Sequence, residues 1–244
     1  MWIAEILLLV CPNGFGASMT QDTDIFKDLQ HRLISNGFDH GAKLRAEQIK
    51  HDYGCSASTV REALFRLSTQ RLVDFQEQRG FRVPNKSPEL LAELTHLRIL
   101  LEGEGTAMSI SRGGVAWEAR LTAVHHQLSH IEKRINTSDD PSEYVDIWFK
   151  AEREFHETLI SSCGSQTLKD THQQIFFRFR QQLMVADREF TFISDNIQQH
   201  YQIMVAALAG DKKLTKQKIH DHLARHLDPA NRTQEPVLGK SSVM

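Results

Sequence analysis

Hydrophobic residues in the first third of the chain recur with helical spacing and then change to an alternating pattern. The helical part predicts a first helix from Ile25 to Ile34, ending at Asn36-Gly37, and a second over about residues 45–53. Ser56 is a capping candidate for a third helix. Val73 and Phe75 then alternate with polar residues, and the turn Gln78-Arg79-Gly80 precedes a second alternating run. Three helices followed by a glycine-turned hairpin predict a winged helix-turn-helix.

From Ser87 onward the pattern predicts only helices. Ser87-Pro88-Glu89 is a good helix start, with a capping serine, proline at the first helical position and an acid in the first turn. The helices are interrupted at Gly113-Gly114, Asp139-Asp140-Pro141, Gly164, near Ser194, at Gly210 and at Pro229. We therefore predict a mainly α fold: a winged helix-turn-helix domain over 22–84, a linker over 85–88, and an all-α antiparallel helical bundle over 89–228.

The two ends of the chain are predicted to lie outside these domains. The opening MWIAEILLLV is apolar, but it contains Glu5, has no basic residue before it and is too short to span a bilayer. Met19 comes shortly before the first patterned helix, so residues 1–21 are interpreted as an upstream extension of the natural start or as a disordered tail. The polar segment 229–244 is also predicted to be disordered.

Charge is unevenly distributed along the chain. Residues 25–86 contain 11 Lys or Arg against 7 Asp or Glu, whereas residues 87–244 contain 18 against 21. A basic first part favours a polyanionic partner there. The three cysteines, Cys11, Cys55 and Cys163, form no CxxC pair. This usage argues against a disulfide framework or a zinc ribbon and is typical of the reducing cytoplasm, where we expect the protein to act.

The third predicted helix has the features of a DNA-reading helix. Ser56, Ser58 and Thr59 place short hydroxyl side chains in its first turn, where a helix N-terminus favours phosphate. Arg61 follows one turn later, where it can present a forked donor to a guanine edge or a phosphate. Arg79 and Arg82 flank the hairpin turn. Arginines on an isolated amphipathic helix are usually only solvated, but the order of helices and basic hairpin favours DNA binding here.

The stretch CSASTVREALFRLSTQRLV, followed by QRGFRV, resembles the GntR family of bacterial regulators. That family combines a serine-capped helix containing VREAL with a glycine-leucine-valine strand start and an RG wing. The resemblance implies that Arg61 contacts operator DNA, supported by Arg45, Ser56, Ser58, Thr59, Arg79 and Gly80. Ala57 stands where many members have Arg or Lys, and Gln48 where an arginine is often found. These departures affect which operator sequence is expected to be bound, and they leave the prediction of DNA binding unchanged.

Polar side chains fall on apolar helix faces in the second half of the chain. On a helical projection, Glu152 and His156 lie in the middle of a face formed by Val145, Trp148, Phe149, Leu159 and Ile160. His200 and His222 lie among apolar residues of later helices, and Arg98 shares a face with Leu94, Leu97, Leu101 and Met108. A buried carboxylate is costly unless it is paired or bound to metal. One such histidine is usually a core residue, but three with a carboxylate favour a divalent metal site.

The segments EREFHETL, HYQIMVAALAGD and IHDHL resemble the FCD effector domain of the FadR-type GntR branch. The resemblance implies a divalent metal ion, zinc before nickel or manganese, bound by Glu152, His156, His200 and His222. It also implies that Arg98 binds a carboxylate effector. Glu152 stands where the family usually has Asp, and His220 and His226 are neighbouring alternatives, with His220 predicted to point outward. Three further features resemble carbon-starvation (CsiR-like) regulators of dicarboxylate and GABA-type catabolism: the segment QRGFRV, the pair Arg98 and Glu102, and the segment WEARLTAVHHQLS.

These observations predict a transcriptional repressor that binds double-stranded operator DNA as a homodimer and is released by a small organic acid. The linker at Pro84–Ser87 is expected to transmit the change, and no membrane partner is expected. Two alternatives stay open: a metal-independent acyl-CoA sensor, and a metal-dependent hydrolase whose Glu/His₃ site activates water. No second carboxylate lies on the Glu152 face to act as a general base, and a hydrolase leaves the winged helix unexplained. We therefore predict no enzymatic activity.

Overall fold

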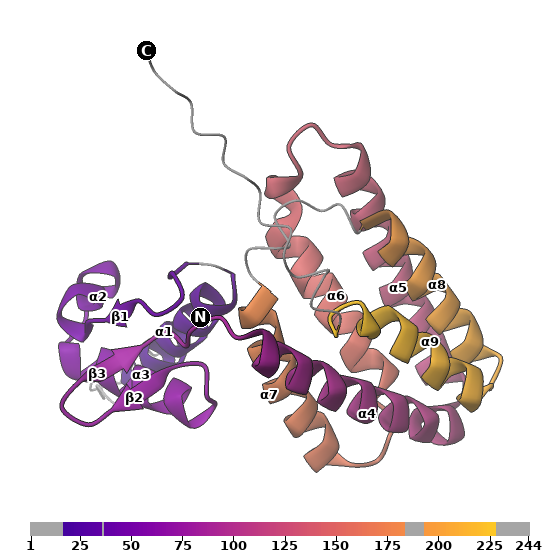
Figure 1. Ribbon diagram of the computed structural model, residues 1–244, viewed down its shortest axis with the longest axis horizontal. Coiled ribbons are helices and arrows are strands. Elements are labelled where there is room, and N and C mark those ends of the chain that lie inside the picture. Colours follow the sequence, from indigo (N-terminus) through magenta and orange to yellow (C-terminus); the bar gives the residue numbers. More distant parts are fainter. Residues whose placement is uncertain (1–16, 36, 184–192, 228–244) are drawn as a thin grey trace, which may run out of the picture.

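The computed structural model describes residues 17–35, 37–183 and 193–227. Its first part contains three helices and a small sheet: α1 (Ala17–Ile34), β1 (Lys43–Leu44), α2 (Ala46–Tyr53), α3 (Ala57–Thr69), β2 (Asp74–Gln76) and β3 (Gly80–Arg82). Its second part is helical: α4 (Pro88–Arg112), α5 (Gly114–Thr137), the 3₁₀ helix η1 (Pro141–Tyr144), α6 (Val145–Leu159), α7 (Gln166–Leu183), α8 (Ile193–Leu208) and α9 (Lys212–Ala224). This mainly helical architecture confirms the predicted fold class (Figure 1).

The first part is a winged helix. Its reading helix α3 begins where predicted, because the Ser56 hydroxyl accepts a hydrogen bond from the backbone N–H of Thr59 at 3.2 Å. Gly54 ends α2 with φ +60°, a conformation that favours glycine. The antiparallel sheet has the order β1-β3-β2, and Phe75 of β2 lies directly opposite Phe81 of β3. Buried aliphatic residues of α1 and α3, including Leu29, Leu33, Leu64 and Leu67, pack beneath this sheet.

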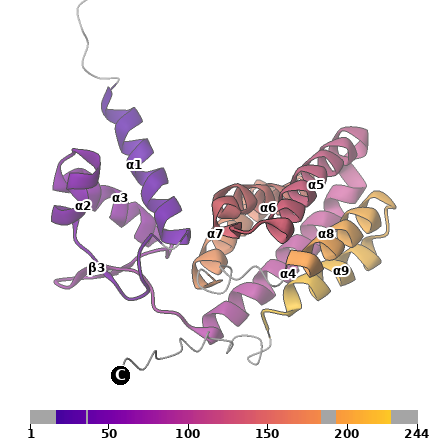
Figure 2. The same ribbon diagram turned by 90° about the horizontal axis from the view of Figure 1, so that it is seen from above.

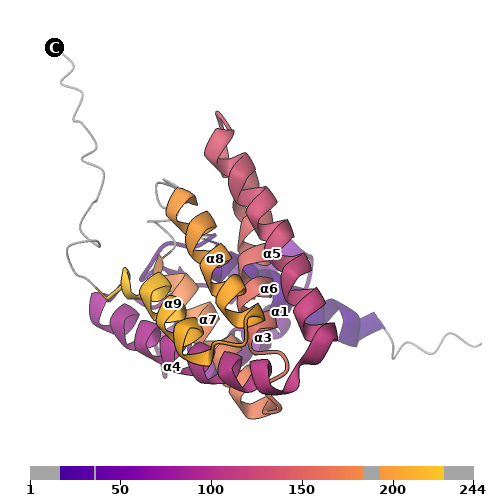
Figure 3. The same cartoon turned by 90° about the vertical axis from the view of Figure 1, so that its right-hand side faces the viewer.

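The six long helices of the second part form a closed ring. Each contacts the next in the order α7, α4, α9, α8, α5 and α6, and α6 returns to α7. Figure 3 shows α4, α9, α8 and α5 in succession along one side. The Ser87 hydroxyl caps α4 by accepting from the N–H of Leu90 at 3.1 Å. Among the residues described, no helix is long and apolar enough to cross a membrane.

Helix α7 also contacts the winged helix, and Figure 2 shows it beside α1. Phe149 of α6 and Phe176 and Phe177 of α7 belong to the same buried apolar cluster as the core of the winged helix. The buried Gln181 amide donates to the backbone carbonyls of Leu72 at 3.0 Å and Leu33 at 3.4 Å. The two parts of the molecule therefore share a packed interface.

Several details differ from the sequence-based expectations. Strand β1 was not predicted, because two residues are too few to show an alternating pattern. Leu97 was placed on the same apolar face as Arg98 but is 42% exposed. Helix α1 begins at Ala17 and so includes residues 17–21, which were assigned to the N-terminal extension. The expectations for residues 1–16 and 229–244 lie outside the described part of the chain.

Candidate functional site

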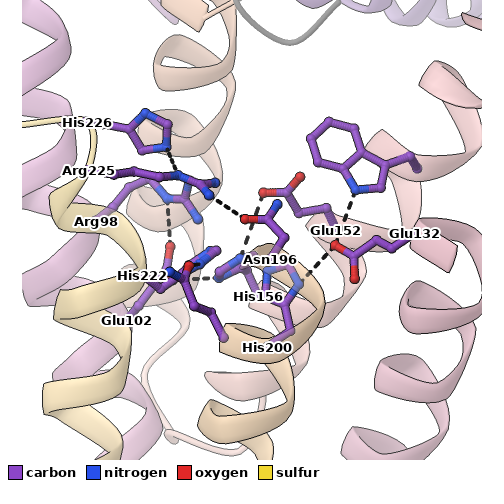
Figure 4. A network of polar contacts seen from close by, with 12 residues as sticks. Arg98, Glu102, Glu132, Glu152, His156, Asn196, His200, His222, Arg225 and His226 are labelled. Atoms are coloured by element: carbon purple, nitrogen blue, oxygen red, sulfur yellow. Dashed lines mark hydrogen bonds and ion pairs between the residues drawn. The ribbon is translucent and has the colours of Figure 1, made fainter. Parts of the chain in front are cut away.

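Four predicted metal ligands meet in the centre of the helical ring. Glu152 and His156 come from α6, His200 from α8 and His222 from α9. One candidate ligand atom from each lies within 4.8 Å of all the others. The three histidines are at most 1% exposed and Glu152 is 9% exposed. In contrast, His220 is exposed, as the helical projection predicted. Figure 4 shows the four side chains converging from three helices.

Each histidine of this cluster is oriented by an acceptor at its Nδ1 atom. His156 Nδ1 lies 2.7 Å from Oε2 of Glu102, and His200 Nδ1 lies 3.1 Å from Oε1 of Glu132. His222 Nδ1 lies 2.8 Å from Oε1 of Gln199. Because these oxygens are acceptors, Nδ1 carries the proton and Nε2 presents its lone pair. This is the arrangement in which an outer acceptor orients a metal-binding imidazole.

The polar atoms at the centre of the cluster fit a metal ion. Nε2 of His156, Nε2 of His200 and Oε2 of Glu152 are buried, and within the described residues they have no hydrogen-bond partner. Buried polar atoms without partners are rare and costly in folded proteins. Burial lowers the pKa of His156, and it lowers that of His222 well below its usual range. Neutral imidazoles and one carboxylate form a donor set that suits a first-row divalent cation.

Glu102 connects the cluster to two neighbouring helices. Its carboxylate is fully buried and accepts from Arg98 Nε at 2.7 Å, from His172 Nε2 at 3.0 Å and from His156. Burial by itself would raise the pKa of Glu102, but the charge of Arg98 and the hydrogen bonds from His156 and His172 outweigh it and hold this pKa well below its usual range. Glu102 therefore contacts both a predicted metal ligand, His156, and the predicted effector-binding arginine, Arg98.

Arg98 lines a small cavity beside the four candidate metal ligands. Its guanidinium lies over the rings of Phe176 and Phe179, at 4.7 and 4.5 Å, and its Nη2 atom is buried without a hydrogen-bond partner among the described residues. The cavity has a volume of about 10 Å³, which is room for roughly one water molecule. Glu152 and His222 line the same cavity, so Arg98 and the metal cluster face a common space.

Sequence reasoning missed two further arginines at this cavity. Arg180 of α7 lies over the Trp148 ring at 4.9 Å, and Arg225 donates to Asn196. Burial lowers the pKa of Arg180 to about 10, and the nearby charge of Arg98 adds to this effect. The run Ile-Phe-Phe-Arg-Phe-Arg, which ends at Arg180, was the signal that could have identified this arginine. Glu132 was missed too, although it lies on the apolar stripe of α5.

The residues predicted to contact DNA lie on one side of the winged helix. Ser56 caps α3, its hydroxyl lies 3.0 Å from that of Thr59 in the first turn, and Ser58 is exposed beside them. The exposed residues Arg45 and Arg61 line a hollow of about 490 Å³ between α3 and the hairpin. Gly80, at φ +80°, lines the same hollow and follows the exposed Arg79 at the wing turn.

Arg61 is held at this surface by an ion pair. Its Nη2 atom lies 3.1 Å from Oε1 of Glu47 in α2, and Lys50 Nζ lies 2.9 Å from the second carboxylate oxygen. The hydrogen bond from Lys50 lowers the pKa of Glu47, and Arg61 contributes to the same effect. Both side chains of the Arg61–Glu47 pair are more than half exposed, so the pair adds little stability and can open for a phosphate or a base.

The two parts of the chain match two known protein families. Residues 21–83 match the bacterial regulatory proteins of the gntR family, and residues 93–225 match the FCD domain. The chain is 31% identical to the HTH-type transcriptional regulator BphR of Paraburkholderia xenovorans over 81% of its own length and 80% of that protein. It is 28% identical to the HTH-type transcriptional repressor GlaR of Escherichia coli K12, over 82% of its length and 91% of that protein.

Solved structures share the fold of this chain. McbR/YncC of Escherichia coli matches with a TM-score of 0.70 and 19% identity, over 85% of this chain and 95% of that one. A GntR-type regulator from Rhodococcus sp. RHA1 matches with a TM-score of 0.68 and 23% identity, over 85% and 98%. These relatives are transcription regulators and not enzymes, so the hydrolase alternative is set aside. The chain belongs to the GntR family of bacterial regulatory proteins, as a DNA-binding transcriptional regulator with an FCD domain.

Proposed function

We propose that this regulator is a repressor whose affinity for operator DNA is controlled by a small organic acid bound beside a divalent metal ion. The observation that carries this proposal is the cluster of Glu152, His156, His200 and His222 next to the Arg98 cavity, in the same chain as a helix-turn-helix. The relative GlaR is named a transcriptional repressor, which supports the direction of the response. A two-fold dimer would present paired reading helices to symmetric half-sites.

Zinc is the metal that we propose, with nickel and manganese as the competing ions. Three imidazole nitrogens and one carboxylate oxygen are ligands that zinc accepts readily. A bound ion would add positive charge and an open coordination position for a carboxylate oxygen. Glu102, Glu132 and Gln199 would hold the three imidazoles in place for it.

The charges around the cavity favour an acid over an acyl-CoA chain. Arg98, Arg180 and Arg225 all line it, and the planar guanidinium of an arginine suits a carboxylate. Because the cavity holds only about 10 Å³, an acid must displace lining side chains as it binds. Binding is therefore coupled to a change in the positions of the helices that carry them.

Helix α7 is the direct route from the cavity to the DNA-binding part. Phe179 and Arg180 line the cavity, and the next two residues contact the winged helix and the linker. The side chain of Gln182 accepts from the N–H of Ser87 at 2.8 Å and donates to the carbonyl of Asn85 at 3.3 Å. These contacts support the proposal that the linker takes part in the coupling, through its anchorage to α7.

A DNA-binding titration tests the proposed function. Full-length protein loaded with zinc is bound to a duplex from the region upstream of its own gene, and small mono- and dicarboxylates are added with and without a chelator. We expect at least one acid to weaken binding about 5- to 150-fold, a typical range for allosteric coupling, and only in the metal-loaded protein. An acid response that survives complete removal of metal would contradict the metal-dependent proposal.

Replacing Gln181 by alanine is expected to reduce this response without removing metal. The change deletes the donor to the carbonyls of Leu72 and Leu33, which leaves buried acceptors without their partner and costs about 1–3 kcal/mol of stability. The change in DNA affinity caused by an acid should fall to less than about threefold, because the direct hydrogen bonds from α7 to the winged helix are lost. The matched control is Gln174→Ala, an exposed glutamine on the same helix. An undiminished acid response in Q181A would rule out this route.

A further inference from the structure

Three aromatic rings in mutual contact form a strip across the reading helix and the wing, and two of them are exposed. Phe65 of α3 is 54% exposed and Phe75 of β2 is 48% exposed. Their ring centroids lie 6.0 Å apart in an edge-to-face arrangement, and the Phe75 ring lies 4.9 Å from that of Phe81 in β3. Single exposed apolar residues are ordinary on protein surfaces, but rings in mutual contact form a patch. We refer to Phe65, Phe75 and Phe81 as the aromatic strip.

The aromatic strip is continuous with the DNA-binding surface. Phe65 follows Arg61 by four positions, so both side chains project from the same side of α3. Phe75 and Phe81 line the hollow of about 490 Å³ together with Arg45 and Arg61. The strip therefore lies beside the basic residues that the GntR helix-turn-helix presents to operator DNA.

The partner of this strip follows from the chemistry of the major groove. A reading helix enters that groove, in which the C5-methyl of thymine is the apolar group that base edges present. A half-exposed phenyl ring one turn beyond an arginine can cover such a methyl group. Phe75 supports this role, because its edge-to-face contact limits where the Phe65 ring can move.

We propose that Phe65, held by Phe75, is a specificity-determining residue that contacts thymine C5-methyl groups next to the base or phosphate bound by Arg61. This role deepens the DNA-binding function of the family and rests on it. Arg61 then supplies the charged contact, and Phe65 selects thymine at an adjacent position. Burial of one methyl group changes the affinity roughly fourfold.

The test compares DNA with and without these methyl groups. Duplexes are first enriched from a random-sequence pool by the full-length chain, and each thymine of the enriched site is then replaced by deoxyuridine, which lacks only the C5-methyl. At one or more positions this replacement should weaken wild-type binding roughly fourfold. Phe65→Ala should bind the thymine duplex correspondingly more weakly and lose its sensitivity to deoxyuridine at the same positions. Phe65→Leu, which keeps an apolar side chain, should retain part of that sensitivity.

One control and the contrary results separate this role from other uses of the strip. Val115→Ala truncates an 80% exposed apolar residue on α5 and should leave DNA binding unchanged. Equal wild-type affinity for thymine and deoxyuridine duplexes would overturn the methyl contact alone, as would an F65A variant that keeps full sensitivity. F65A that alters self-association but not DNA binding would assign the strip to a protein contact instead. Failure to enrich any duplex would overturn DNA binding itself.

Discussion

Replacing Arg61 by alanine is expected to weaken binding to the operator about 5- to 150-fold per reading helix. This range corresponds to the loss of one bidentate arginine contact with a base edge, which contributes about 1–3 kcal/mol. Arg61 is exposed on α3, and its guanidinium forms an ion pair with the surface carboxylate of Glu47. The chain should fold normally without it, since surface ion pairs of this kind add little stability. Fluorescence anisotropy with a labelled duplex measures the change.

The salt dependence of the same measurement identifies the kind of contact. If Arg61 reads a base, R61A loses specificity at one position, whereas loss of a phosphate contact weakens binding to all sequences and reduces the salt slope by about one. Arg120→Ala is the matched control, because Arg120 is 63% exposed and its ion pair with Glu154 lies on the helical ring. An R61A variant with wild-type affinity at low and moderate salt would remove α3 from the DNA interface.

The winged helix could be predicted from the sequence because its signals are local. The cap at Ser56, the αL residue Gly54 and the apolar spacing of α3 each act within a few residues, and all appear where the pattern placed them. One departure is structurally costly: Arg71 has φ +58° at the position where the family signature has glycine. The glycine of the family signature is the signal for this positive φ, because glycine adopts it without strain.

Only part of the candidate metal site could be identified from the sequence. Glu152 and His156 share one helix face, so a helical projection identifies them directly. The acceptors Glu102 and Glu132 lie on other helices, and their pairing with His156 and His200 depends on how the ring closes. The contact of Gln181 with the winged helix could not be predicted for the same reason. A glutamine on a helix is usually exposed, and only docking of the two parts buries it.

Replacing His200 by alanine is expected to abolish stoichiometric metal binding. The change removes one of three imidazoles and leaves Glu132 buried without the histidine that contacts it at 3.1 Å. Wild-type protein in a metal excess of about 100 times Kd gains about 2.7 kcal/mol of stability, and H200A should lose this gain. Elemental mass spectrometry of the purified protein measures metal content, and thermal melting with and without a chelator measures the stabilisation.

The control for this change is His220→Ala, on the exposed side of the helix that carries His222. H220A should keep wild-type metal content and the same loss of melting temperature on chelation. Glu152→Asp provides a second comparison: it keeps the carboxylate but shortens its reach, so metal should stay bound with a changed affinity. Metal content that is equal in H200A and wild type, or a melting temperature that no chelator changes in either, would contradict the assignment of this cluster as a metal site. We expect H200A to lose both metal and the acid response while it keeps its affinity for DNA. This result would show that sensing and DNA binding are separable functions of one chain.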